Sequence, residues 1–140
     1  MKIDILAIGR LKSRPVRELV GDYSSRLGHY LGIEIHACRD QRQALARIGA
    51  HDFLVVLDER GTQLTSEGLA DFLAAHQNKG TKRMAFYIGG PEGVGQEVRE
   101  RADFRLSLSQ MTFPHEMIQA ILLEQLYRAC SILKGEPYHK

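Results

Sequence analysis

The 140-residue sequence has no tryptophan, only two cysteines and no long apolar run. Cys38 and Cys130 lie far apart and form no CxxC pair, so neither a disulfide framework nor a zinc site is indicated. The six histidines show no metal-ligand spacing either. No stretch approaches the roughly 20 apolar residues of a membrane span, and Asp4 stands where a signal peptide would be apolar. We therefore expect a cytoplasmic protein without a membrane segment or a bound metal.

The chain also lacks an excess of one charge, because 19 basic and 17 acidic residues give a net charge of +2. Residues 1–47 depart from this balance with nine bases and five acids. Four of these bases fall within eight residues: Arg10, Lys12, Arg14 and Arg17. Such a cluster could bind a polyanion, because each neutralised phosphate releases counterions. A solvated loop and helix face is the simpler explanation of the cluster taken alone.

Apolar runs alternate with helical patterns along the chain. The apolar runs predict five strands, at residues 3–8, 33–38, 53–57, 84–88 and 104–108. The patterns between them predict five helices, at residues 15–29, 39–49, 66–78, 95–102 and 114–133, with a turn from Asp58 to Gly61. We predict a single domain over residues 1–140 with an α/β fold, in which helices cover both faces of a mostly parallel sheet.

Three of the predicted strands end in unusual loops: Leu57-Asp58, Gly89 to Gly93, and Ser109 to His115. Ligands bind at the carboxyl ends of parallel strands. If these strands are neighbours, the three loops therefore meet and form a pocket. The third loop combines hydroxyl and amide groups with apolar side chains, which suits a small cofactor.

The glycine-rich loop matches neither the dinucleotide-binding nor the P-loop fingerprint. Glycine lets the backbone approach a ligand closely, and four glycines with a proline exceed what a plain turn requires. A simple turn between a strand and a helix is the alternative. His115 ends the third loop at the start of the last helix, and a lone histidine at such a position is more often solvated.

The predicted last helix is apolar on more than one stripe, with residues such as Met117, Ile121 and Leu126 spread around it. A helix that is apolar over so much of its girth is either central or covered by a partner. A homodimer and a fully intramolecular core helix both explain the pattern.

Several segments together resemble one family, the bacterial ribosomal large-subunit RNA methyltransferase H family of the SPOUT superfamily. The segments are residues 87–93, 106–115, 126–129 and 137–140. The opening residues 2–9 and the Val56-Leu57-Asp58 turn also match, so the resemblance covers essentially the whole chain. The stretch 38–50 looks shorter than in many relatives.

The resemblance implies a C-terminal trefoil knot that holds S-adenosylmethionine, and methylation of N3 of a pseudouridine in 23S rRNA on the 70S ribosome. It also implies a homodimer with the site near the subunit interface. No metal is needed, because the sulfonium of the methyl donor is already electrophilic. Carried onto matching positions, the family's cofactor contacts fall on Leu57, Gly89, Leu108, Ser109, Gln110, Met111, Thr112 and Phe113.

The resemblance also suggests which residues act on the RNA. The pseudouridine N3 is a poor nucleophile until its proton leaves, and His115 and His139 are the candidate bases. Tyr138 could stack on the target base, and Lys140 could hold a phosphate as a point charge where some members have arginine. The basic residues between Arg10 and Arg17 become the expected contact to the RNA backbone.

Two functions of other classes remain as alternatives. The first is a non-catalytic ribosome-binding factor that keeps the fold, and the intact segments 89–93 and 108–115 argue against it. The second is a small-molecule enzyme, and the basic N-terminal segment with the tail 138–140 argues against that. Measured binding of S-adenosylmethionine and of RNA discriminates between them.

Overall fold

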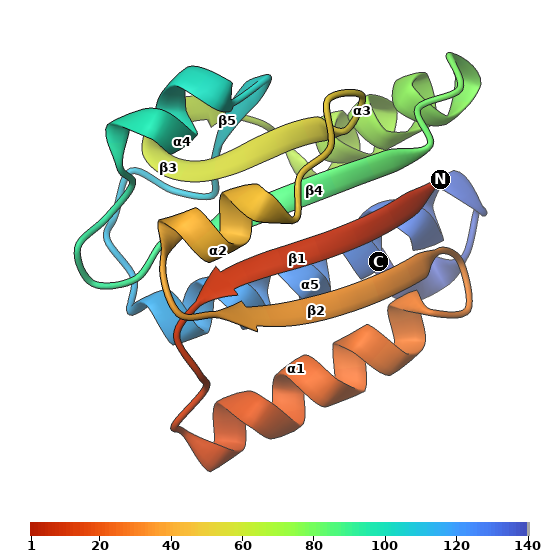
Figure 1. Cartoon of the computed structure of the whole chain (residues 1–140). Helices are drawn as coiled ribbons and strands as arrows, with labels where there is room; N and C mark the ends of the chain where they lie inside the picture. The colour runs from red at the N-terminus through yellow and green to blue at the C-terminus, as the bar shows by residue number, and fades with distance from the viewer. Residues whose placement is uncertain (140) are drawn as a thin grey trace.

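Five parallel strands in the order β2-β1-β4-β3-β5 form one sheet at the centre of the computed structural model, which describes residues 1–139 and, for His139, the backbone alone (Figure 1). The strands are β1 (Lys2–Ile8), β2 (Gly32–Cys38), β3 (Phe53–Gln63), β4 (Arg83–Ile88) and β5 (Phe104–Ser107). The predicted parallel α/β sheet is thereby confirmed.

Helices cover both faces of the sheet, as predicted (Figure 1). One face carries α1 (Arg14–Leu27), α3 (Ser66–Asn78) and α5 (His115–Leu133). The other face carries the two short helices α2 (Gln41–Ala46) and α4 (Gln96–Arg101). A 3-10 turn, Pro137–His139, follows α5. None of the helices in residues 1–139 has the length and apolar character needed to cross a membrane.

The two layers explain the apolar runs of the central strands. In β1, Ile3 and Ile5 pack in the larger core beneath α1 and α5, whereas Leu6 packs in the smaller core beneath α2. A strand that buries both faces needs apolar residues at successive positions rather than at alternate ones. The edge strand β2 has one partner, β1, and shows the alternating exposure of a half-buried strand.

The predicted end of the third strand at Leu57 is wrong. Strand β3 continues to Gln63, and both Leu57 and Thr62 pair with Leu106 of β5, so the residues between them bulge out of the ladder. Gly61 permits this bulge, because a Cβ there would lie 2.6 Å from the carbonyl oxygen of Arg105. The turn predicted from Asp58 to Gly61 is also wrong, because these residues lie within β3 and form its bulge.

The interior of the same chain buries much of the apolar surface of α5. Leu122, Leu123 and Leu126 are fully buried in the core between α5 and the sheet. Ile121 is half-buried, and Leu133 remains 40% exposed near the helix end. Intramolecular packing therefore explains most of the wide apolar face, and the homodimer stays a prediction.

Candidate active site

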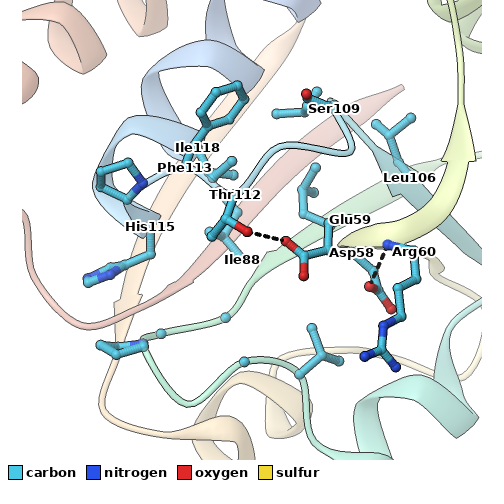
Figure 2. A pocket seen from close by; sticks show the side chains of 18 of the residues that line it. Asp58, Glu59, Arg60, Ile88, Leu106, Ser109, Thr112, Phe113, His115 and Ile118 are labelled. Carbon is cyan, nitrogen blue, oxygen red and sulfur yellow. Dashed lines mark hydrogen bonds between the residues drawn. The ribbon is translucent and has the colours of Figure 1, made fainter.

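The carboxyl ends of β3, β4 and β5 meet at a cavity of about 480 Å³ (Figure 2). Apart from Arg99 of α4, its wall comes from three segments of the chain, within residues 57–60, 88–94 and 106–118. These are the three loops that the sequence predicted to meet, and their meeting is confirmed. Sites for small molecules commonly measure about 300–1,000 Å³, so the cavity has the size of a cofactor site.

Most residues expected to contact a cofactor line this cavity. They are Leu57, Gly89, Leu108, Ser109, Met111, Thr112 and Phe113. Gln110 is exposed and is not among the lining residues. The structure thus brings seven of the eight expected contacts together. Their role in holding S-adenosylmethionine stays a prediction.

The glycine-rich loop is a tight turn that also lines the cavity. Gly90 and Gly93 form an antiparallel bridge, and the amide of Gly93 donates to the carbonyl of Gly90 at 3.0 Å. Gly93 has a φ of +81°, a conformation that favours glycine. A Cβ on Gly89 would lie 2.7 Å from the carbonyl oxygen of Gly93. The turn itself therefore requires two of the glycines, so their number alone does not indicate a ligand.

Side-chain hydroxyls fix the loop that follows β5. Ser109 Oγ accepts a hydrogen bond of 3.0 Å from the amide of Met111. The buried Ser107 Oγ lies 2.9 Å from the carbonyl oxygen of Ser109 and 3.1 Å from that of Glu59. Thr112 donates a bond of 2.9 Å to the Glu59 carboxylate, which joins this loop to the bulge of β3 (Figure 2). These hydroxyls therefore set the shape of the cavity wall.

The start of α5 joins the cavity to the basic N-terminal loop. His115, the first residue of α5, is half-buried and lines the cavity (Figure 2). The next residue, Glu116, accepts hydrogen bonds from the amides of Lys12 at 2.6 Å and Ser13 at 3.1 Å. The Ser13 and Lys12 amides hold the pKa of Glu116 below its usual value. The loop after β1 is thus tied to the helix end that carries His115.

The four clustered bases are all exposed at this end of the sheet: Arg10, Lys12, Arg14 and Arg17. Two of them also make local contacts. Arg14 pairs with Glu18 at 3.2 Å, and Arg17 Nη1 donates to the carbonyl oxygens of Leu11 and Lys12. Arg17 therefore helps to shape the loop as well as charging it. Contact of the cluster with RNA stays a prediction.

The C-terminal tail lies away from the cavity of its own chain. The Tyr138 hydroxyl bonds to the Glu124 carboxylate at 2.9 Å and lies 3.1 Å from the Tyr23 hydroxyl. At a rise of about 1.5 Å per residue, Glu124 lies roughly 13 Å further along α5 than His115. Tyr138 is not among the residues that line the cavity. The side chain of His139 and the whole of Lys140 lie outside the described residues.

Sequence reasoning expected Asp58 at the pocket but missed three other charged residues of the cavity wall: Glu59, Arg60 and Arg99. The Asp58 side chain is only 7% exposed and lies 3.4 Å from Arg105 Nη1 and 4.0 Å from Arg99 Nε. The place of Glu59 and Arg60 directly after a buried apolar run is a signal that could have found both. Arg99 carries no such signal, because it is one of several charges on a short helix.

One group in residues 1–139 has a spacing that could hold a metal: Asp4, Glu34 and His36, at the start of β1 and along β2. Arg83 pairs with the buried Asp4 carboxylate, and Lys2 Nζ lies 2.9 Å from Glu34. Cations of the protein therefore already neutralise these carboxylates. The group lies outside the cavity wall, and we assign it no part in the site.

Comparison with known proteins agrees with this architecture. A family model described as "Predicted SPOUT methyltransferase" matches residues 1–139. The chain is 43% identical to ribosomal RNA large subunit methyltransferase H of Coprothermobacter proteolyticus, with 100% of both chains covered. It is 40% identical to the protein of that name from Trichlorobacter lovleyi, with 99% of both covered.

A solved structure shares the fold at low sequence identity. It is a probable methylase family protein from Haemophilus influenzae, with a TM-score of 0.61 and 11% identity over 99% of this chain and 70% of that one. At that identity the likeness supports the fold alone. The family model and the full-length relatives show that this chain belongs to the SPOUT methyltransferases, and among them to the ribosomal RNA large subunit methyltransferase H family.

Proposed function

We propose that residues 1–140 act as one domain that transfers a methyl group from S-adenosylmethionine to large-subunit ribosomal RNA. One observation carries the proposal: three loops at the positions that resemble the family's cofactor motifs line a single cavity of about 480 Å³. The names of the full-length relatives support the class of substrate. The trefoil knot and a cytoplasmic location belong to the same proposal and rest on the resemblance.

The target atom in this proposal is N3 of a pseudouridine in 23S rRNA within the 70S ribosome. S-adenosylmethionine supplies a methyl group on an electrophilic sulfonium, so the carbon–sulfur bond breaks as the N3–carbon bond forms. The N3 proton must leave, because the neutral nitrogen between two carbonyls is a poor nucleophile. The target base must also leave its stack to reach the cavity.

His115 is the candidate general base. Its side chain lines the cavity at the first turn of α5, and a neutral imidazole can accept a proton near pH 7. A positioned base contributes about 10²–10⁴-fold to such reactions. The fixed loops around Ser109 and Gly93 supply the second contribution, because they hold the reacting groups in register.

The tail acts in a homodimer in this proposal. Tyr138 is bonded to the middle of its own α5, well away from the cavity at the start of that helix. Tyr138 and Lys140 would therefore complete the cavity of the partner subunit, where the ring stacks on the target base and the ammonium holds a phosphate. His139 is the second candidate base at that position.

Transfer of labelled methyl from S-adenosylmethionine to 70S ribosomes lacking the modification tests the proposal, with nucleoside analysis of the 23S rRNA. We expect N3-methylpseudouridine in the product. Cofactor binding without transfer to these ribosomes would point to another RNA target. Absence of both binding and transfer would favour the non-catalytic ribosome-binding factor.

A further inference from the structure

Three arginines from three different elements contact one buried carboxylate beside the cavity, two through their guanidinium groups and one through its backbone amide. They are Arg60 from the bulge of β3, Arg99 from α4 and Arg105 from β5. Arg105 Nη1 and Arg99 Nε lie 3.4 and 4.0 Å from the same oxygen, Oδ2 of Asp58. The other carboxylate oxygen of Asp58 accepts the backbone amide of Arg60 at 3.0 Å (Figure 2). Asp58 thus holds the side chains of Arg99 and Arg105 and the backbone of Arg60.

The cluster keeps a positive charge at the cavity rim. Asp58 is the buried acid, and Glu59, the other acid in the bulge, is hydrogen-bonded to Thr112. Three guanidinium groups against these two carboxylates leave a local charge of +1. The side chains of Arg99 and Arg105 are 46% and 47% exposed, so they can reach a ligand in solvent. Each guanidinium offers five N–H donors, of which the contacts to Asp58 use few.

Fixed guanidinium groups favour an oxyanion ligand. Their planar forks match a phosphate or carboxylate with two parallel hydrogen bonds. The ion pairs with Asp58 orient the guanidinium groups of Arg99 and Arg105 before a ligand arrives, which lowers the entropy cost of binding, whereas the bond to Arg60 fixes its backbone. Arg60 and Arg99 line the cavity itself, whereas Arg105 lies beyond the lining residues. A ligand that contacts all three must therefore extend past the cavity, as a nucleic-acid backbone does.

We infer that Arg60, Arg99 and Arg105 form an anion-binding cluster that holds a backbone phosphate of the RNA at the mouth of the cavity. The inference rests on the proposed function and adds a second RNA contact to the loop of Arg10 to Arg17. The α-carboxylate of S-adenosylmethionine is the other oxyanion that could reach these groups. The two ligands are separable by experiment, because one belongs to the RNA and the other to the cofactor.

The test compares R60Q/R105Q with K79Q/K82Q, which makes the same charge change at two lysines exposed at the opposite end of the sheet. Arg99 is left in place so that Asp58 keeps a cationic neighbour. Binding of a 23S rRNA fragment is measured at several salt concentrations, and binding of S-adenosylmethionine separately. For R60Q/R105Q we expect RNA affinity to fall about tenfold and the salt slope to drop by about 0.7 for each phosphate that the variant no longer neutralises, with cofactor affinity within about twofold.

Other outcomes separate the ligands and the proposals. A fall in cofactor affinity with an unchanged RNA slope would overturn the phosphate assignment in favour of the carboxylate. If R60Q/R105Q and K79Q/K82Q have the same RNA affinity, salt slope and cofactor affinity, the three arginines do not form an anion-binding site. The proposed function would stand in that case, provided the wild type transfers methyl. R60K/R105K should have the salt slope of the wild type, because lysine keeps the positive charge. The unfolding midpoints of this variant and of R60Q/R105Q should be equal, which shows that the difference in slope does not come from stability.

Discussion

The hydroxyl of Tyr138 and the carboxylate of Glu124 form a hydrogen bond of 2.9 Å on the helix that begins at the cavity. Arg128 donates a bond of 2.7 Å to the same carboxylate, and its guanidinium carbon lies 5.0 Å from the centre of the Tyr138 ring. Burial and the bonds to Tyr23 and Glu124 raise the pKa of Tyr138 above its usual value. The tail is therefore fixed against its own α5 and held away from its own cavity.

Deletion of residues 138–140 should abolish RNA methylation and leave S-adenosylmethionine affinity within about twofold, because Tyr138 does not line the cavity. The point variants Y138F and Y138A separate stacking from hydrogen bonding. Stacking on a base is worth about 1–3 kcal/mol, so Y138A should lose about tenfold or more in RNA affinity while Y138F retains most of it. Methylation at the wild-type rate after the deletion would refute the role of the tail.

The hydrogen bonds to Glu116 predict a pH-dependent contribution to stability. The pKa of this carboxyl lies below its usual 4.5 in the folded protein. Its charged form therefore stabilises the fold fully above pH 4.5, and the effect disappears as the pH falls through the lower folded value. The difference in unfolding free energy between wild type and E116Q should shrink between pH 6 and pH 3. A difference that stays constant over this range contradicts the prediction, and E97Q on α4 is the control.

Gly89→Ala should disrupt the cavity wall. The added Cβ would lie 2.7 Å from the carbonyl oxygen of Gly93, so the turn must open. We expect at least a tenfold loss in S-adenosylmethionine affinity by calorimetry. Gly21→Ala on α1 is the matched control, because nothing lies within 4 Å of its added Cβ. That control should gain about 0.5–1 kcal/mol of stability from helix propensity. Equal affinities in the two variants would contradict the assignment of the glycine turn.

Replacement of Arg10, Lys12, Arg14 and Arg17 by alanine should flatten the salt dependence of RNA binding. The slope falls by about 0.7–0.9 for each phosphate that the protein ceases to neutralise. Arg17 also holds two carbonyl oxygens of its own loop, so R10A/K12A gives the cleaner measure of RNA binding. An unchanged slope in both variants would rule the cluster out as an RNA contact.

His115→Gln should slow methyl transfer by about 10²–10⁴-fold if the imidazole takes the N3 proton. Cofactor affinity should stay within about twofold, and the limb of the pH–rate profile that reports the base should disappear. His29→Gln, at an exposed position after α1, is the control and should leave the profile unchanged. A wild-type profile in H115Q would exclude His115 as the base. His139 would then be the remaining candidate base, or the rate would come from the positioning of the methyl group and N3 without a base.

Local patterns were enough to predict most of the elements. The helix expected at residues 66–78 is α3, and Thr65 caps it by accepting the amide of Gly68 at 2.9 Å. The bulge of β3 could not be read in this way. It depends on Thr62 pairing with Leu106, a contact between distant residues that no local period encodes.

The parts of the site that lie at strand ends could be predicted from the sequence. The parts whose position depends on tertiary packing could not. The loops after Leu57 and Ile88 follow buried strands, so their meeting followed from the parallel order. The position of Gln110 away from the cavity wall depends on the path of the loop that Ser109 and Ser107 fix. The place of Arg99 depends on how the short helix α4 lies over β3.

The order of the sheet also governs how this protein can be made. Strand β1 lies between β2 and β4, and the first helix packs against the last one, α5. Proteins in which many contacts join segments distant in the sequence fold slowly. A ribosome adds about 5–20 residues per second, so β1 emerges seconds before the strand and helix that cover it. The nascent chain therefore holds an unfinished core until α5 has left the exit tunnel, because Leu122, Leu123 and Leu126 of this helix fill the core beneath the sheet.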